Sequence, residues 1–192
     1  MSKSFSADRS ELFKGRGWVV LLRGLTAITF GILALASPHT TPGTLGLLFG
    51  LYALAHGILS VAAAIGGRGQ HGCLLLATEG IIGLWAGVVT LWTTLPSPKA
   101  LIFLIWVWAV GAGVLRIVEA IRLRKEISGD VWLALSGSVT VLLAIMLMLR
   151  PVVGAVGLAL LISAFAFICG VFEILLGYEL RAAGRRRLIG SA

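Results

Sequence analysis

The chain alternates between six long hydrophobic runs and short polar breaks. Each run is close to the ~20 apolar residues that an α-helix needs to cross a bilayer. Proline and glycine are frequent in the breaks, as is usual where a helix stops. No ten-residue stretch of alternating apolar and polar positions recurs, which argues against a membrane β-barrel. The pattern predicts an all-α integral membrane protein with spans at about residues 18–36, 44–65, 73–95, 100–121, 131–149 and 154–178.

The six spans form three tandem copies of one two-helix unit, at about residues 18–65, 73–121 and 131–178. An N-terminal segment, 1–17, precedes them, and a basic tail, 179–192, follows. Because each unit contains two spans, all three units run parallel, which predicts pseudo-threefold symmetry about the membrane normal rather than an inverted repeat. The residues that recur with offsets of 56 and 57 positions are Arg23-Gly24, Glu79-Gly80 and Ser136-Gly137 in the first helices and Gly57, Gly113 and Gly170 in the second helices.

Lysine and arginine lie almost entirely on one side of the predicted membrane domain. The chain ends and the even-numbered connections carry 12 of them, whereas the odd-numbered connections carry only Lys99 and Arg150. Since cytoplasmic segments carry the excess of Lys and Arg, both termini are expected in the cytoplasm. Placed in this way, the net charge of +8 indicates contact with anionic lipid at the cytoplasmic face and not nucleic-acid binding.

The composition leaves no room for a separate soluble unit. The chain is 58% hydrophobic and only 12% charged, whereas about a quarter of the residues in soluble domains are charged. Serine-hydrolase, zinc-protease, phosphate-loop and dinucleotide motifs are all missing from the sequence. Cys73 and Cys169 lie in apolar runs, where small buried thiols are expected. We therefore expect no catalytic residue, metal or cofactor, and no enzymatic activity.

Six ionisable residues fall inside the predicted spans, where each costs a few kcal/mol and is therefore a functional candidate. Counted from the helix ends, all six lie in the cytoplasmic half of the bilayer. The repeat aligns Arg23 with Glu79, and Arg116 with Glu173. We expect a buried cluster in which Arg23 pairs with Glu79, and Arg116 with Glu173 or Glu119. The six residues are Arg23, His56, Glu79, Arg116, Glu119 and Glu173.

Three roles are open for this cluster on sequence grounds. The charged pairs can fix helix register without any transport. Arg116 and Glu119 are close enough to the interface to extend toward water. The cluster can also respond to protons or bind a solute, since imidazole titrates near pH ~6.5 and Glu79 or Glu173 can take up a proton on acidification. For His56, a hydrogen-bonded packing role stands beside a switch role.

Glycine recurs at four-residue spacing inside two spans. Small residues at this spacing let helix backbones approach closely in lipid. The same glycines can serve packing within the chain or contacts in a homo-oligomer or with another membrane protein. They are Gly46 and Gly50 in the second span and Gly83 and Gly87 in the third.

Four ordered segments along the chain form a recognisable pattern. They are Trp18-x4-Arg23-Gly24, residues 30–35 followed by Pro38, residues 48–57, and residues 120–126 followed by Trp132. In this order they resemble the HdeD family of bacterial membrane proteins. The resemblance covers about residues 15–180 and implies an inner-membrane protein associated with acid stress. His56 stands where many relatives carry Asp.

The resemblance therefore implies a role in tolerance of acid or another envelope stress, for which a proton-responsive buried cluster is one mechanism. Two other functions fit the sequence: a small-solute or ion transporter that uses the same cluster, and a structural protein that binds lipid or other membrane proteins. A water-filled cavity at Glu79 would favour transport, whereas a dry and fully paired cluster would favour the structural role.

Overall fold

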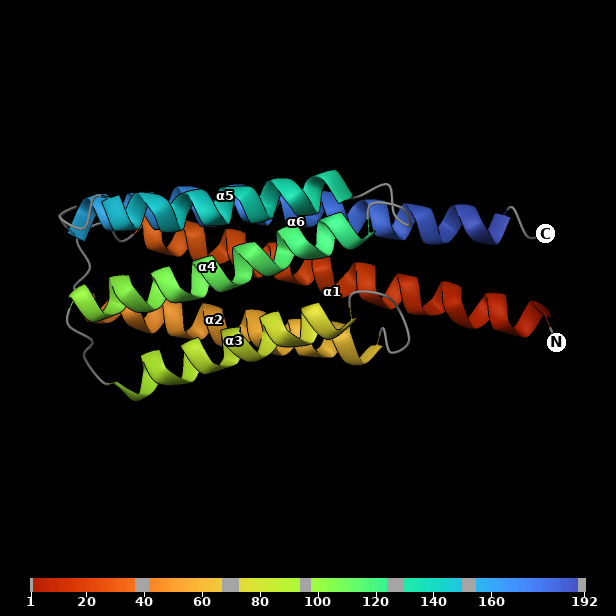
Figure 1. The fold of residues 1–192 in the computed structure, drawn as a ribbon, viewed down its shortest axis with the longest axis horizontal. Helices are drawn as coiled ribbons and strands as arrows, with labels where there is room; N and C mark the ends of the chain where they lie inside the picture. Colours follow the sequence, from red (N-terminus) through yellow and green to blue (C-terminus); the bar gives the residue numbers. More distant parts are fainter. Residues whose placement is uncertain are drawn as a thin grey trace.

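The described residues of the chain form six helices in a computed structural model (Figure 1). The structure describes the backbone of residues 2–36, 42–66, 73–93, 98–123, 130–149 and 155–189. The predicted helix stops at Pro38, Pro96 and Pro151 lie outside these residues. The helices are α1 (Ser2–Ala36), α2 (Pro42–Gly66), α3 (Cys73–Trp92), α4 (Pro98–Leu123), α5 (Asp130–Leu149) and α6 (Ala155–Ile189).

All six helices are long and apolar enough to cross a membrane, which confirms the predicted fold class. The spans within α1 and α6 are Gly17–Ala36 and Ala159–Ala182. Both helices continue beyond their spans, so that segment 1–17 and most of the basic tail extend the membrane helices rather than forming separate units. The two extensions project side by side from one end of the bundle, which also holds both termini (Figure 1).

The most extensive helix contacts are not those inside the predicted two-helix units. They join α1 to α6, α2 to α3, and α4 to α5, while the contacts of α1 with α2, α3 with α4, and α5 with α6 are smaller. Each tight pair therefore links the second helix of one repeat to the first helix of the next. The pairing of α6 with α1 closes the bundle, and it is the third such pair.

One pair of glycines lies at the centre of each tight interface. A Cβ atom on Gly24 would lie 2.7 Å from the carbonyl oxygen of Gly170, and one on Gly57 would lie 2.8 Å from that of Gly80. The corresponding distance from Gly113 to Gly137 is 3.1 Å. Because all six positions are related by the repeat, the same close backbone contact occurs three times around the axis.

The four glycines predicted from their spacing are buried within the bundle. Gly46 is buried in α2. A Cβ atom on Gly50 would lie 2.8 Å from Leu91, and one on Gly87 would lie 2.8 Å from the backbone nitrogen of Leu54. Gly83 packs against Gly57. Three of the four therefore serve the interface of α2 with α3, which is the intramolecular alternative.

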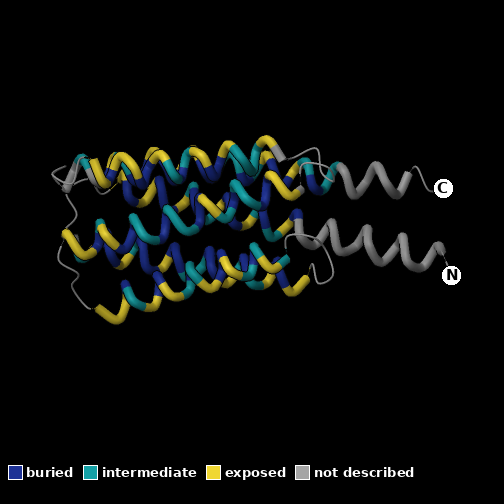
Figure 2. Tube along the Cα trace, in the orientation of Figure 1, coloured by how far each residue is buried: buried dark blue, intermediate teal, exposed yellow. Residues whose placement is uncertain are grey.

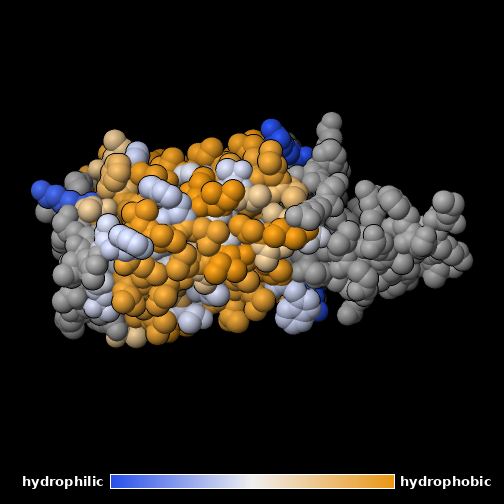
Figure 3. Space-filling view, turned by 90° about the horizontal axis from the view of Figure 1, so that it is seen from below, coloured by the Kyte–Doolittle hydropathy of each residue, from blue (hydrophilic) through white to orange (hydrophobic). Residues whose placement is uncertain are grey.

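Exposed and buried residues alternate along the helices of the bundle (Figure 2). The face seen in Figure 3 is largely hydrophobic, as expected for a chain in contact with lipid. Large hydrophobic side chains such as Leu25, Ile81 and Phe103 are more than half exposed. At the end that holds the termini, the Arg181 guanidinium lies 4.4 Å from the centre of the Trp18 ring. A tryptophan stacked with a cation is typical of the boundary between lipid and water.

The half of the bundle away from the termini has a continuous hydrophobic interior. Tyr52, Trp108 and Phe165 occupy repeat-equivalent positions, and all three are buried. The ring centres of Tyr52 and Trp108 lie 5.7 Å apart in an edge-to-face arrangement. Aliphatic side chains such as Leu101 and Leu147 fill the space beyond them. This half of the axis is apolar, and among the described residues the buried Arg, Glu and His side chains lie in the other half.

Candidate functional site

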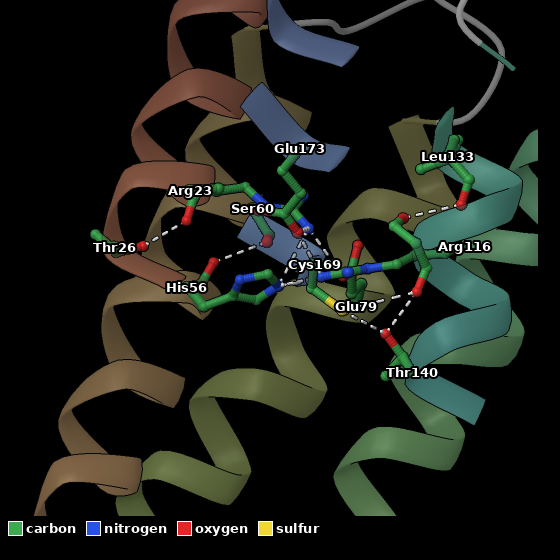
Figure 4. A network of polar contacts seen from close by, with 11 residues as sticks. Arg23, Thr26, His56, Ser60, Glu79, Arg116, Leu133, Thr140, Cys169 and Glu173 are labelled. Carbon is green, nitrogen blue, oxygen red and sulfur yellow. Dashed lines mark hydrogen bonds and ion pairs between the residues drawn. The ribbon is translucent and has the colours of Figure 1, made fainter. Parts of the chain in front are cut away.

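Two arginines and two glutamates form a closed ring on the axis of the bundle (Figure 4). Arg23 Nη2 lies 2.9 Å from Glu79 Oε1 and 3.3 Å from Glu173 Oε1. Arg116 contacts the same two oxygens, through Nε at 2.8 Å from Glu79 and through Nη2 at 2.7 Å from Glu173. Each carboxylate therefore lies between two guanidinium groups, and the four formal charges sum to zero. We call these four residues the charge ring.

The repeat explains why these four side chains meet. Arg23 and Glu79 lie six residues in from the first residues of their spans, Gly17 and Cys73, which is about 9 Å of helix at 1.5 Å per residue. Parallel repeats bring equivalent positions to the same depth around one axis. The equivalent positions in the first helices hold Arg23, Glu79 and Ser136, and those in the second helices hold Ser60, Arg116 and Glu173.

Ser60 and Ser136 occupy the two uncharged positions among these six. Ser60 Oγ donates to the carbonyl oxygen of His56 at 2.7 Å, and Ser136 Oγ donates to that of Leu133 at 2.9 Å. Both hydroxyls are thus satisfied by their own helices. The three repeats supply six equivalent positions, and charged residues occupy only four of them.

His56 lies against one side of the charge ring and is completely buried. Its Nε2 lies 3.1 Å from Arg23 Nη2, 3.2 Å from Arg116 Nη2 and 3.1 Å from Glu79 Oε1. A guanidinium can only donate. Nε2 therefore accepts from the arginines when it carries no proton, and donates to Glu79 when it does. His56 Nδ1 is buried and has no hydrogen-bond partner.

Cavities lie on the bundle axis on both sides of the charge ring. The cavity toward the termini, which we call the polar cavity, has a volume of about 40 Å³. Charged side chains of the ring and Glu119 line it, together with Val20 and Leu176. The cavity on the other side has a volume of about 30 Å³ and almost wholly apolar walls, among them Phe49, Trp108 and Phe165. We call it the apolar cavity.

The structure brings the six ionisable residues predicted from the sequence together on the axis. The predicted pairs Arg23–Glu79 and Arg116–Glu173 are present, and the cross pairs Arg116–Glu79 and Arg23–Glu173 join them into one ring. Glu119 is buried and lines the polar cavity beside the ring. Within the described residues, no group of three or more His, Cys, Asp or Glu side chains is arranged to hold a metal ion.

Two polar contacts, one on the axis and one near it, were not predicted from the sequence. Cys169 Sγ lies 3.4 Å from Thr140 Oγ1, next to the ring. Trp132 Nε1 donates to Glu179 Oε1 at 2.9 Å, where α5 meets α6 near the termini. Cys169 is the repeat equivalent of His56, so extending the repeat alignment by one helical turn identifies its place on the axis. Nothing in the repeat points to Glu179.

We expect the hydrogen bond from Trp132 to contribute to stability. Replacing Trp132 with Phe removes a donor to the half-buried Glu179 carboxylate, and should lower the free energy of unfolding by about 1 kcal/mol. Unfolding of the purified protein in mixed detergent micelles measures this. Trp85→Phe is the control, because Trp85 is 55% exposed on the lipid-facing surface. Equal losses in the two variants would attribute the effect to lost ring area and not to the hydrogen bond.

One family model matches the chain in three successive copies, at residues 22–92, 78–149 and 135–191. Its description is a short repeat of unknown function, DUF308. The three matches begin 56 and 57 residues apart, which are the offsets that relate the positions of the charge ring. The first two matches each span a tight helix pair, α2 with α3 and α4 with α5. No curated protein and no solved structure matches the chain.

Proposed function

The chain belongs to the DUF308 family, the repeat domain of HdeD proteins, and from this premise we propose that it acts in tolerance of acid or another envelope stress. The observation that carries the proposal is the charge ring with His56, buried on the axis of a multi-pass membrane protein. Such groups are costly inside a membrane, so their presence in the bundle interior calls for a role. That role is either to hold the repeats together or to respond to a proton.

The charge balance of the ring suggests how a proton would act. A proton on Glu79 would change the sum of the four formal charges from zero to +1. Arg23 and Arg116 would then face each other across a neutral carboxyl group, and their bonds to it would weaken. Since the ring joins α1, α3, α4 and α6, this change would loosen the contacts between repeats. In this mechanism the bundle with altered packing either transmits the signal or binds a partner.

The location we propose is the bacterial inner membrane, with both termini in the cytoplasm. The asymmetry of Lys and Arg along the chain supports this orientation, as does the common end of the two termini (Figure 1). Arg181 and the rest of the basic tail would then meet anionic lipid at the cytoplasmic face. The partners that we propose for the altered bundle are a second copy of this chain or another membrane protein.

Transport of a small solute or ion is the second candidate, and the polar cavity favours it because Glu79 lines it. A transport path must also continue through the other half of the bundle. Repeat-equivalent aromatic side chains close that half, including Tyr52, Trp108 and Phe165. The stress-response function therefore fits the packing better than transport does.

Acid survival of a deletion strain tests the proposal. Wild-type protein should restore survival and Glu79→Gln should fail to do so at matched membrane levels, because Gln mimics a permanently protonated carboxyl group. The matched control is Thr78→Ala, which changes the neighbouring, exposed residue on the lipid-facing side of α3. Thr78→Ala should restore survival fully.

Loss of stability alone could also prevent rescue, and a second variant separates the two causes. Glu79→Gln combined with Arg116→Gln keeps the charge sum of the ring at zero. If this double variant accumulates normally and still fails to restore survival, the titratable ring itself is required. Full rescue by both variants would contradict the proposed mechanism, and a deletion strain without an acid phenotype would contradict the stress role.

A further inference from the structure

Two polar atoms of the charge ring are buried without a hydrogen-bond partner. They are Arg23 Nε, a donor, and Glu173 Oε2, an acceptor. Their residues are only 5% and 4% exposed. Buried polar groups nearly always have a partner, and an unpaired one is costly. Both side chains line the polar cavity, so a molecule held there can satisfy the donor and the acceptor together.

The charged groups around the polar cavity have both signs and therefore favour a neutral occupant. A cation would meet the guanidinium groups of Arg23 and Arg116. An anion would meet the carboxylates of Glu79, Glu119 and Glu173. A small neutral molecule that both donates and accepts hydrogen bonds avoids both conflicts. Water has this property, and one water needs at least about 10–15 Å³ and two to four polar partners. A volume of about 40 Å³ with charged walls meets both conditions.

We propose that the charge ring meets solvent from one side only, through about two or three water molecules held in the polar cavity. This cavity lies between the ring and the end of the bundle that holds both termini. Repeat-equivalent aliphatic side chains, Val20, Leu76 and Leu133, line it on that side. Water that exchanges past these side chains connects Glu173 and Glu79 with solvent at the terminal end.

The other side of the ring is sealed by packing. The apolar cavity has a similar volume, but its walls are almost wholly apolar, and apolar cavities of this size stay dry. Its wall includes Phe49, Ile105 and Ile162, which occupy repeat-equivalent positions. Solvent therefore has no polar route to the ring through the described residues of this half.

Contact with solvent from one side defines the side from which the ring exchanges protons. Only the physiological meaning of this contact rests on the proposed function. The water itself is a property of the folded bundle. Labelling of the purified protein can therefore succeed where the survival experiment fails, and the reverse is equally possible. The two failures are thus distinguishable.

Radiolytic hydroxyl-radical labelling in ¹⁸O-water tests the inference on the full chain in lipid nanodiscs. Radicals formed from internal water label the side chains that line it. Leu176 lines the polar cavity and Leu143 lines the apolar cavity. They are a matched pair, since they are 8% and 6% exposed, and each lies six residues before the last residue of its span. Leu176 should be labelled several-fold faster than Leu143.

A cavity-filling variant provides the second arm of the test. Val20→Phe places a larger side chain in the polar cavity and should abolish the excess labelling of Leu176. Its folding is checked by gel filtration and thermal unfolding, and Val20→Ile is the milder substitute if the bundle does not assemble. Equal labelling of Leu176 and Leu143 in the wild type would overturn the inference. So would unchanged labelling of Leu176 in the filled, folded variant.

Discussion

Replacing Arg116 with Gln should lower the free energy of unfolding of the bundle by about 3–5 kcal/mol, because it leaves a buried charge without compensation. Arg116 contacts both carboxylates of the charge ring, at 2.8 Å and 2.7 Å. Without it, Glu79 and Glu173 share the single guanidinium of Arg23, and the ring carries a net charge of −1. Unfolding in mixed detergent micelles, followed by circular dichroism, measures the loss.

The double variant Arg116→Gln with Glu79→Gln shows whether charge balance is the cause. It restores a charge sum of zero and leaves the Arg23–Glu173 pair in place. It should therefore cost less than the two single changes together, with a coupling energy of about 1–3 kcal/mol. Interhelical hydrogen bonds in membranes are often worth only about 0.6 kcal/mol. A loss of that size in Arg116→Gln, with no coupling, would show that the ring adds little to stability.

Replacing Gly57 with Ala should destabilise the bundle by about 1–3 kcal/mol, since a single methyl group would force two backbones apart. The added Cβ atom would lie 2.7 Å from the backbone nitrogen of Leu84 and 2.8 Å from the carbonyl oxygen of Gly80. Neither atom can move without shifting α3 against α2. The same reasoning applies to Gly24 against α6 and to Gly113 against α5, but with a longer contact of 3.1 Å at Gly113 the effect there should be smaller.

Gly111→Ala is the matched control for this change. Gly111 is also a glycine inside a membrane helix, and its Cβ atom would meet only Ile82, at an ordinary distance of 3.5 Å. Alanine favours a helix over glycine by up to about 1 kcal/mol, so this variant should be neutral or slightly more stable. A loss of stability at Gly111 equal to that at Gly57 would contradict the view that close backbone contact at the tight pairs holds the bundle together.

Helix existence and number were predictable from the sequence because they depend on local properties. The spans of the structure agree with the six apolar runs, and α3 ends at Trp92 where the hydrophobic run continues to residue 95. The three repeats were also recognisable, because equivalent glycines and charged residues recur at fixed offsets. The extensions of α1 and α6 were not predicted as helix, since a polar segment without a helix stop carries no strong signal for either state.

The depth of the ionisable residues was predictable for the same reason, since position along a helix of known span fixes it. The presence of Arg23, Glu79, Arg116 and Glu173 at equivalent depths follows from the offsets alone. The sequence also indicated two of the four ion pairs. It did not indicate that each carboxylate contacts both arginines, or that His56 joins them through one nitrogen.

Sequence by itself thus determined the spans, the threefold repeat and the depth of the charged residues along the helices, because apolar runs and their repeat period can be identified in the chain. Only the tertiary structure decided that α6 packs on α1 and that Arg23 reaches Glu173 across 150 residues of sequence. The physical reason is that lipid supplies no hydrophobic force to choose between apolar faces. Lateral neighbours are chosen by steric fit at the glycine contacts and by the pairing of buried charges, and both depend on residues far apart in the chain.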